Sequence, residues 1–184
     1  MMPKAKSLKI VLISGSLRSQ SVNGAVIATA AHLAPPGVSA LVYRRLQELP
    51  HFNPDDDRES LLEPVLHLRE TLRTANAVML STPEYAGSLP GSFKNMLDWT
   101  VGGGSLYGKP VGWINPSAHG GSIETYRDLR TVLDRAGAVI VESACVDSPT
   151  PRGAIGANRL VATAEIRQVL QRAMRELAEG ARAL

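Results

Sequence analysis

Side chains suited to binding a phosphate gather in one short loop near the start of the chain. The loop begins at Gly15 and carries Ser16, Arg18, Ser21 and Asn23. Their hydroxyl, amide and guanidinium groups donate hydrogen bonds, and the loop leads into a predicted helix whose first N–H groups favour an anion. The pattern therefore predicts a phosphate-binding loop. The alternative interpretation is a polar turn in which the serines and the asparagine only cap the helix and Arg18 is solvated.

Two further loops are rich in glycine and proline. Residues 83–91 read PEYAGSLPG, and their two prolines and two glycines favour a loop of fixed shape whose backbone amides suit a flat polar ring. The alternative for this segment is a rigid crossover without a ligand. Residues 116–121 read PSAHGG, and these small residues permit close approach to the backbone. The third signal is weak alone, but three such loops at one edge of a fold indicate a binding site.

Each of these loops follows a short apolar run of the kind found in buried strands. Predicted strands alternate with predicted helices along the whole chain, which favours an α/β fold with a doubly wound, five-stranded parallel sheet and helices on both faces. In the strand order 2-1-3-4-5, ligands bind between the first and third strands. The predicted strands are 8–14, 38–43, 77–82, 110–115 and 138–142, and the predicted helices are 22–33, 60–75, 90–100, 122–136 and 158–179, with Ser60 and Glu63 as a capping pair for the second helix.

Composition excludes several classes of protein. The 184 residues suit one domain, 1–184, and the net charge of +3 comes from scattered lysines and arginines without the aromatic platforms of a nucleic-acid binder. One cysteine, Cys145, permits no internal disulfide and is expected to be a buried small residue. No apolar stretch is long enough to span a membrane, so we expect a cytoplasmic protein without nucleic-acid or membrane partners.

Rival catalytic motifs are incomplete. Residues 103–109 spell G-x-x-x-x-G-K, but Pro110 stands where a nucleotide-binding P-loop needs Ser or Thr, so we expect a glycine-rich connector. The histidines lack metal-ligand spacing, and residues 55–57, three aspartates, lack the glycine and glutamate of a calcium loop and are expected to form a solvated turn.

The loop motifs together resemble the NADPH-dependent FMN reductase family of flavodoxin-like proteins. The matching segments are residues 15–23 (G-S-x-R-x-x-S-x-N), 82–99 (T-P-E-Y-x-G-S-x-P-G-x-x-K-N-x-x-D-W) and 108–111 (G-K-P-V). They occur in order, and the resemblance covers about residues 8 to 145. One departure is Ala86, where family members often carry Asn. The resemblance therefore does not extend to how this position tunes the flavin.

The resemblance implies an FMN site built from the three loops. It implies that the phosphate is held by Ser16, Arg18, Ser21 and Asn23. It implies that the isoalloxazine ring is lined by Pro83, Glu84, Tyr85, Ala86 and Gly87, with Ser117, Gly120 and Gly121 beside it.

The implied activity is that of an FMN-dependent NAD(P)H oxidoreductase. Hydride would pass from NADPH or NADH to bound FMN and on to an acceptor: free flavin, a quinone, an azo compound or a metal oxyanion. Because the flavin carries the chemistry, we expect no catalytic acid or base and no metal ligand. The alternative function is a flavodoxin-like electron carrier that uses no nicotinamide, and a third is a phosphate-ligand sensor without a redox role.

The resemblance also implies a homodimer or homotetramer. The expected contact is the helix that carries Lys94, Asn95, Asp98 and Trp99. The alternative for Phe93 and Trp99 is burial in the core of the subunit. Tyr85 and His119 are candidates for shaping the nicotinamide or acceptor pocket, and the alternative for His119 is a solvated loop residue.

Overall fold

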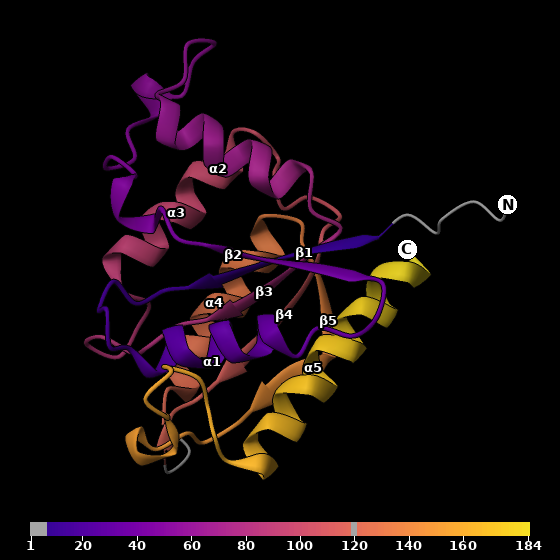
Figure 1. The fold of residues 1–184 in the computed structure, drawn as a ribbon. Helices are drawn as coiled ribbons and strands as arrows, with labels where there is room; N and C mark the ends of the chain where they lie inside the picture. The colour runs from indigo at the N-terminus through magenta and orange to yellow at the C-terminus, as the bar shows by residue number, and fades with distance from the viewer. Residues whose placement is uncertain (1–6, 119–120) are drawn as a thin grey trace, which may run out of the picture.

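A five-stranded parallel sheet forms the centre of the protein (Figure 1). The computed structural model describes residues 7–118 and 121–184. The strand order is β2-β1-β3-β4-β5, as the sequence predicts. Strands β3 and β4 are buried along their whole length, which explains their unbroken apolar sequences. The strands are β1 (Leu8–Ser14), β2 (Val38–Tyr43), β3 (Ala77–Ser81), β4 (Pro110–Asn115) and β5 (Val139–Asp147).

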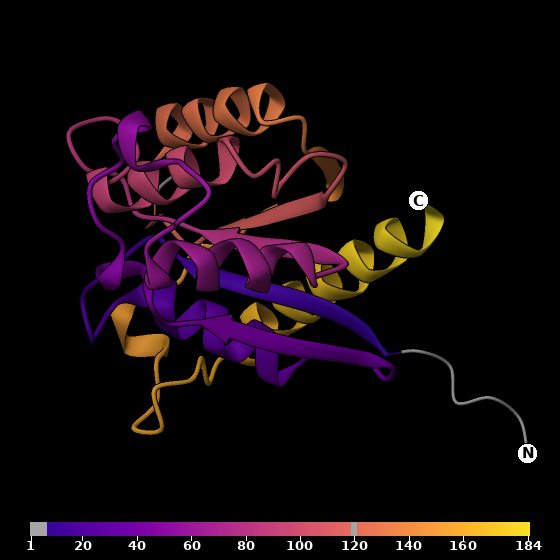
Figure 2. The ribbon, with the colours of Figure 1, turned by 90° about the horizontal axis from the view of Figure 1, so that it is seen from above.

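Helices cover both faces of the sheet. Helices α2, α3 and α4 contribute to the apolar cluster on one face, and α1 and α5 to the cluster on the other. The view from above shows α4 and α5 on opposite sides of the strands (Figure 2). No helix among the described residues is long and apolar enough to cross a bilayer. The helices are α1 (Val22–His32), α2 (Glu63–Arg73), α3 (Gly91–Val101), α4 (Ile123–Arg135) and α5 (Ala164–Ala183), with 3₁₀ turns η1 (Leu46–Glu48), η2 (Pro54–Asp56) and η4 (Arg152–Ala154).

The aromatic side chains of α3 belong to the core of the subunit. Phe93 and Trp99 are fully buried. The Trp99 ring meets Phe52 edge to face at 5.0 Å, and its Nε1 donates to the carbonyl of Pro50 at 2.9 Å. The core alternative is therefore confirmed for both residues, and the Trp99 ring is not exposed for a contact with another subunit.

Two of the helix starts predicted from the sequence are wrong. Helix α2 begins at Glu63, with Leu62 as the N-cap residue, so Ser60 does not cap it. Pro64 lies in the first turn, where its missing N–H group is not needed, whereas a helix that began near Ser60 would need that N–H for a backbone bond.

Helix α5 begins at Ala164, six residues later than predicted. The preceding residues form a tight loop in which Ile155 pairs with Val161. The Val161 N–H donates to Thr29 Oγ1 of α1 at 2.8 Å, so a long-range bond holds this segment out of the helix.

Strand β5 is longer than predicted. It continues to Asp147, and its register against β4 shifts between the Val111–Ile140 pair and the Trp113–Cys145 pair. The shift places exposed Glu142 inside the strand, where the sequence indicated an end, because an irregular edge strand tolerates residues that face water.

Candidate functional site

The first loop leaves the sheet in contact with the end of β3. The Gly15 N–H donates to the Ser81 carbonyl at 2.8 Å. A Cβ atom at Gly15 would lie 2.4 Å from Thr82 Oγ1 and 2.9 Å from the Phe93 ring. Only glycine permits this close approach, so the first and second loops start side by side.

The loop after β1 retains the donors that a phosphate requires. Ser21 caps α1 by accepting from the Gly24 N–H at 3.2 Å, as the alternative interpretation expects. The N–H groups of Ser19, Gln20 and Val22 nevertheless have no acceptor among the described residues. Exposed Arg18 has no carboxylate partner within residues 7–118 and 121–184. Open N–H groups at a helix start beside a free guanidinium fit a phosphate.

Asn23 has a different position from the rest of the phosphate loop. Its side chain is buried, and its Oδ1 accepts from Ser81 Oγ at 2.8 Å. The amide oxygen thus fixes α1 to the end of β3. The backbone N–H and the Nδ2 group of Asn23 remain as donors for a phosphate.

The second loop contains a tight two-residue turn. Tyr85 and Ser88 exchange backbone hydrogen bonds of 3.0 and 3.2 Å across the turn. Ala86 and Gly87 between them have φ angles of 51° and 78°, the left-handed pair of a type I′ turn. Their N–H groups and that of Glu84 have no acceptor in the described part of the chain. The turn therefore presents free backbone donors, and the Tyr85 ring beside them is 50% exposed.

Helix α4 holds this loop in place. The Thr125 hydroxyl donates to the Glu84 carboxylate at 3.1 Å. The Ser88 hydroxyl donates to Asp128 Oδ2 at 2.5 Å. These bonds flank the turn, so its donors are fixed before a ligand binds.

The third loop is organised by Asn115 at the end of β4. Asn115 Nδ2 donates to the Gly121 carbonyl at 3.1 Å and to Asp147 Oδ1 at 2.8 Å, and Asn115 Oδ1 accepts from the Ser117 N–H at 3.1 Å. Ser117 Oγ lies 2.6 Å from Ser122 Oγ. Two predicted positions of this loop, His119 and Gly120, lie outside the described residues.

One buried tyrosine joins the ends of the strands from which the second and third loops start. Tyr126 Oη accepts from the Thr82 N–H at 3.2 Å and donates to the Ile114 carbonyl at 2.8 Å. Burial raises the pKa of Tyr126 far above its ordinary value, so the phenol stays a donor. The sequence does not predict this role, because a tyrosine on the inner face of an amphipathic helix carries no local signal of a contact with two strand ends.

The structure brings the predicted residues to one edge of the sheet in two groups. Ser16, Arg18 and Ser21 line a cavity of about 510 Å³ beside the first loop. The ends of β3 and β4, from which the second and third loops start, are joined through Tyr126. Because β1, β3 and β4 are neighbours in the sheet, both groups lie at the carboxyl ends of adjacent strands, where α/β sheets bind ligands.

The residues of the rival motifs have structural contacts. Lys109 Nζ donates to the Ala75 carbonyl at 2.5 Å, in keeping with a connector. Asp57 is largely buried and pairs with Arg69 at 2.8 Å, so the expectation of a solvated turn is wrong for this residue. Cys145 is only partly buried, and desolvation raises the pKa of its thiol to about 12. No cluster of three or more His, Cys, Asp or Glu residues suited to a metal occurs within residues 7–118 and 121–184.

Comparison with known proteins identifies a matching family and similar reductases. Residues 8–150 match the family described as NADPH-dependent FMN reductase. A quinone reductase of Escherichia coli (strain K12) is 30% identical over 161 residues, which are 85% of this chain and 82% of that protein. A 2-hydroxy-1,4-benzoquinone reductase of Burkholderia sp is 29% identical over 180 residues, 96% of this chain and 97% of that protein.

Solved structures with a similar fold include a flavoenzyme oxidoreductase and a flavodoxin. FerB of Paracoccus denitrificans, a flavoenzyme NAD(P)H:(acceptor) oxidoreductase, matches with a TM-score of 0.78 and 26% identity over 96% of this chain and 98% of that one. A flavodoxin from the domain Archaea has a TM-score of 0.63 at 11% identity, covering 95% and 99% of the two chains, and this likeness concerns the fold alone.

Proposed function

The chain belongs to the NADPH-dependent FMN reductase family and is an NAD(P)H-dependent FMN/quinone reductase, and on that premise we propose that it binds FMN in the three loops and reduces a quinone. FMN supplies the two-electron chemistry when bound, between the nicotinamide and the acceptor. The observation that carries the proposal is the row of free N–H donors in the first and second loops, at the ends of neighbouring strands β1 and β3.

The phosphate loop has the groups that anchor FMN. The proposed phosphate ligands are the N–H groups at the start of α1, with Ser16, Arg18 and Ser21 around them. A phosphate dianion there gains charge-assisted hydrogen bonds from Arg18 and from the helix terminus. Asn23 contributes by positioning the helix against Ser81 and by its remaining N–H groups.

The second loop is the proposed support of the ring. Free N–H groups at Glu84, Ala86 and Gly87 offer donors to ring atoms that gain negative charge on reduction. Gly87 has nothing within 4 Å of the position of a Cβ, so a flat ligand can lie against its backbone. Pro83, Ser117 and Gly121 complete the proposed lining, and half-exposed Tyr85 is placed to shape the nicotinamide or quinone pocket.

A quinone is the acceptor that the relatives favour. Relatives that match this chain include a quinone reductase, a probable NADPH:quinone oxidoreductase and a 2-hydroxy-1,4-benzoquinone reductase. Free flavin, azo compounds and metal oxyanions are the acceptors against which this choice is tested.

A second copy of the chain is part of the proposal. Lys94 and Asp98 form an ion pair of 2.6 Å on α3, and both line a hollow of about 620 Å³ with Leu17, Leu49 and Phe52. This partly apolar face of α3 is the proposed contact of a homodimer or homotetramer. The single-domain organisation and the cytoplasmic location stay predictions from the sequence.

The function is tested by comparing acceptors. Protein reconstituted with FMN is given NADPH and, in turn, 1,4-benzoquinone, free FMN, an azo dye and chromate. We expect the largest kcat/KM for the quinone. No steady NADPH oxidation with any acceptor would identify an electron carrier instead, and a larger kcat/KM for another acceptor would overturn the quinone assignment.

A further inference from the structure

A cavity on the β2 side of the phosphate loop is lined by three arginines from three separate segments. Arg18 comes from the first loop, Arg44 from the end of β2, and Arg159 from the loop before α5. The cavity has a volume of about 510 Å³, and none of its lining residues is acidic. Arg18 is the proposed partner of the FMN phosphate, so Arg44 and Arg159 are the lining guanidinium groups that remain for a second anion. Without a carboxylate in the lining, these two charges produce a positive potential on the β2 side of the cavity.

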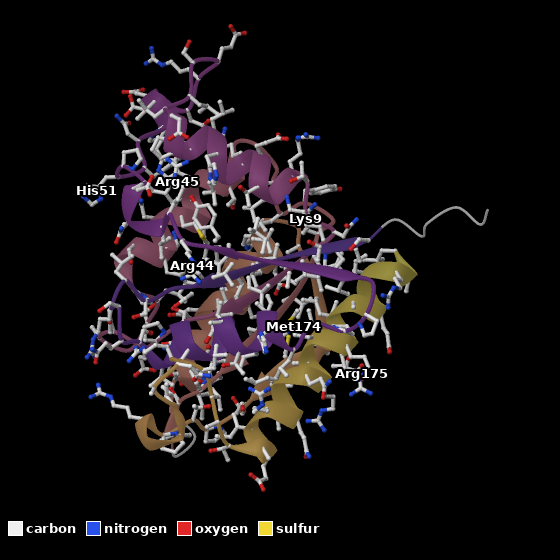
Figure 3. All side chains as sticks on the ribbon, in the orientation of Figure 1. Lys9, Arg44, Arg45, His51, Met174 and Arg175 are labelled. Atoms are coloured by element: carbon white, nitrogen blue, oxygen red, sulfur yellow. The ribbon has the colours of Figure 1, made fainter. Side chains whose placement is uncertain are left out.

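Arg44 is free of the ion pairs that occupy the next residue. Arg45 bonds to Glu48 at 2.6 Å and to both carboxylate oxygens of Glu63 on α2. Arg44 has no carboxylate partner among the described residues. Figure 3 shows Arg45 toward α2 and Arg44 on the side of the sheet where α1 lies. The two neighbouring arginines thus serve different surfaces, and the charge of Arg44 is available to a ligand.

Arg159 is held beside the phosphate loop by the backbone. Its φ angle of 66° is rare for a residue with a side chain. Its guanidinium donates to the Ser19 carbonyl at 3.2 Å. The Val161 N–H bond to Thr29 fixes the same segment to α1. These contacts keep the charge of Arg159 at the cavity, although the backbone conformation of this residue is strained.

We propose that this cavity binds the 2′-phosphate of NADPH and thereby favours NADPH over NADH. This inference rests on the proposed function, because it deepens the nicotinamide site of the same enzyme. The proposed FMN site uses one phosphate, at the start of α1. A dinucleotide that reaches the flavin ring has a second ribose beyond its pyrophosphate, and only NADPH carries a phosphomonoester there. Planar guanidinium forks are well suited to a phosphomonoester.

The cavity also has a surface for the rest of the adenosine. Leu17, Val42, Leu46 and Leu160 contribute apolar side chains between the arginines. A nucleoside needs such apolar walls with a few placed polar groups. The same cavity can therefore bind both the 2′-phosphate and the adenosine that carries it.

The test measures binding without turnover. Adenosine 2′,5′-bisphosphate and 5′-AMP are titrated into the FMN-loaded protein by calorimetry, since they differ only in the 2′-phosphate. We expect the bisphosphate to bind the parent protein at least about 10-fold more tightly. Arg44→Ala and Arg159→Ala should each remove most of that difference. Arg175→Ala is the matched control, because Arg175 is an exposed arginine on α5 outside the cavity lining (Figure 3), and it should leave the difference intact.

Kinetics supply a second readout. The ratio of kcat/KM for NADPH to that for NADH should fall about 10-fold in Arg44→Ala, by the loss of one charge-assisted bond. Equal binding of the bisphosphate and 5′-AMP by the parent protein would overturn the inference. So would an Arg44→Ala variant that weakens FMN as much as the bisphosphate, because the cavity would then hold the flavin phosphate.

Failure of the proposed function has a different signature. A protein that retains no FMN, or that does not oxidise NADPH, refutes the reductase assignment whatever the calorimetry gives. Protein that oxidises NADPH but shows no preference for the bisphosphate refutes only the 2′-phosphate site.

Discussion

Removing one hydroxyl from the protein core should weaken both the fold and the flavin site. Tyr126 Oη accepts from the Thr82 N–H and donates to the Ile114 carbonyl, so it connects the ends of β3 and β4. Tyr126→Phe keeps the ring and deletes these bonds. Thr82 is fully buried, and its N–H group would then lack an acceptor.

The expected cost follows from the burial of these groups. An unsatisfied buried N–H costs about 1–3 kcal/mol, and the lost bond to Ile114 adds about 1 kcal/mol. We therefore expect Tyr126→Phe to lower the free energy of unfolding by about 2–4 kcal/mol. Because the second and third loops lose their shared anchor, the affinity for FMN should fall as well.

The matched control is Tyr43→Phe. Tyr43 is buried too, but its hydroxyl has no hydrogen-bond partner in the described structure. Its removal should leave stability unchanged or raise it by up to about 1 kcal/mol. Urea unfolding measures both variants, and quenching of flavin fluorescence gives the Kd for FMN. Equal unfolding free energies for the two variants would refute the reasoning.

The pH dependence of stability gives a further check on Tyr126. Its pKa is raised above the ordinary value of 10.0 by burial, so the unfolded chain releases the phenolic proton first. The stabilisation is complete below pH 10 and is lost as the pH rises above it. Tyr126→Phe should show a smaller loss of stability above pH 10 than the parent protein, and an equal loss would contradict the assignment.

Four further outcomes are expected. Arg18→Ala should weaken FMN binding by roughly 10- to 150-fold, by the loss of a charge-assisted bond, and an unchanged Kd would remove Arg18 from the phosphate site. Tyr85→Ala should lower kcat/KM for NADPH with little change in urea unfolding, since the ring is half exposed, and unaltered turnover with bound flavin would refute its role. Ala86→Asn should raise the unfolding free energy by about 1 kcal/mol, because Asn tolerates a φ of 51° better than Ala, and a lower melting temperature would contradict the turn assignment. Cys145, with a thiol pKa of about 12, should react with iodoacetamide at pH 8 roughly 100-fold more slowly than free cysteine, and comparable rates would show that the thiol is not desolvated.

The sheet could be predicted from the sequence because its strands are marked locally. The apolar run 8–14 ends at a glycine, and the run 110–115 begins at a proline and ends before another, so both boundaries agree with the structure. The strand order followed from the alternation of strands and helices together with the loop motifs. These signals are local, because a few consecutive residues determine where each strand begins and ends.

The features that were missed depend on contacts between distant parts of the chain. The segment before α5 has a sequence compatible with a helix, and the bond from Val161 to Thr29 is what keeps it out of one. The anchoring role of Tyr126 depends on two strand ends that meet only in the folded protein. The free charge of Arg44 is likewise invisible in sequence, where it stands next to the paired Arg45.

The sequence predicted which loops form the site, but not which hydrogen bonds their side chains make. The residue types of the phosphate loop indicated donors, but the sequence did not distinguish Ser21, which caps α1, from Asn23, whose amide oxygen bonds to Ser81. Which hydrogen bonds a polar side chain makes is decided by its neighbours in space. The loop therefore identifies the chemistry, and the structure identifies which groups remain free for it.

A visible spectrum of the protein tests the central claim most directly. The purified protein is incubated with FMN, desalted, and mixed with NADPH in the absence of oxygen. We predict that the flavin is retained and that its absorbance bleaches on addition of NADPH. Loss of the flavin on desalting would contradict the three-loop site, and retained flavin that stays yellow with NADPH and NADH would contradict the reductase.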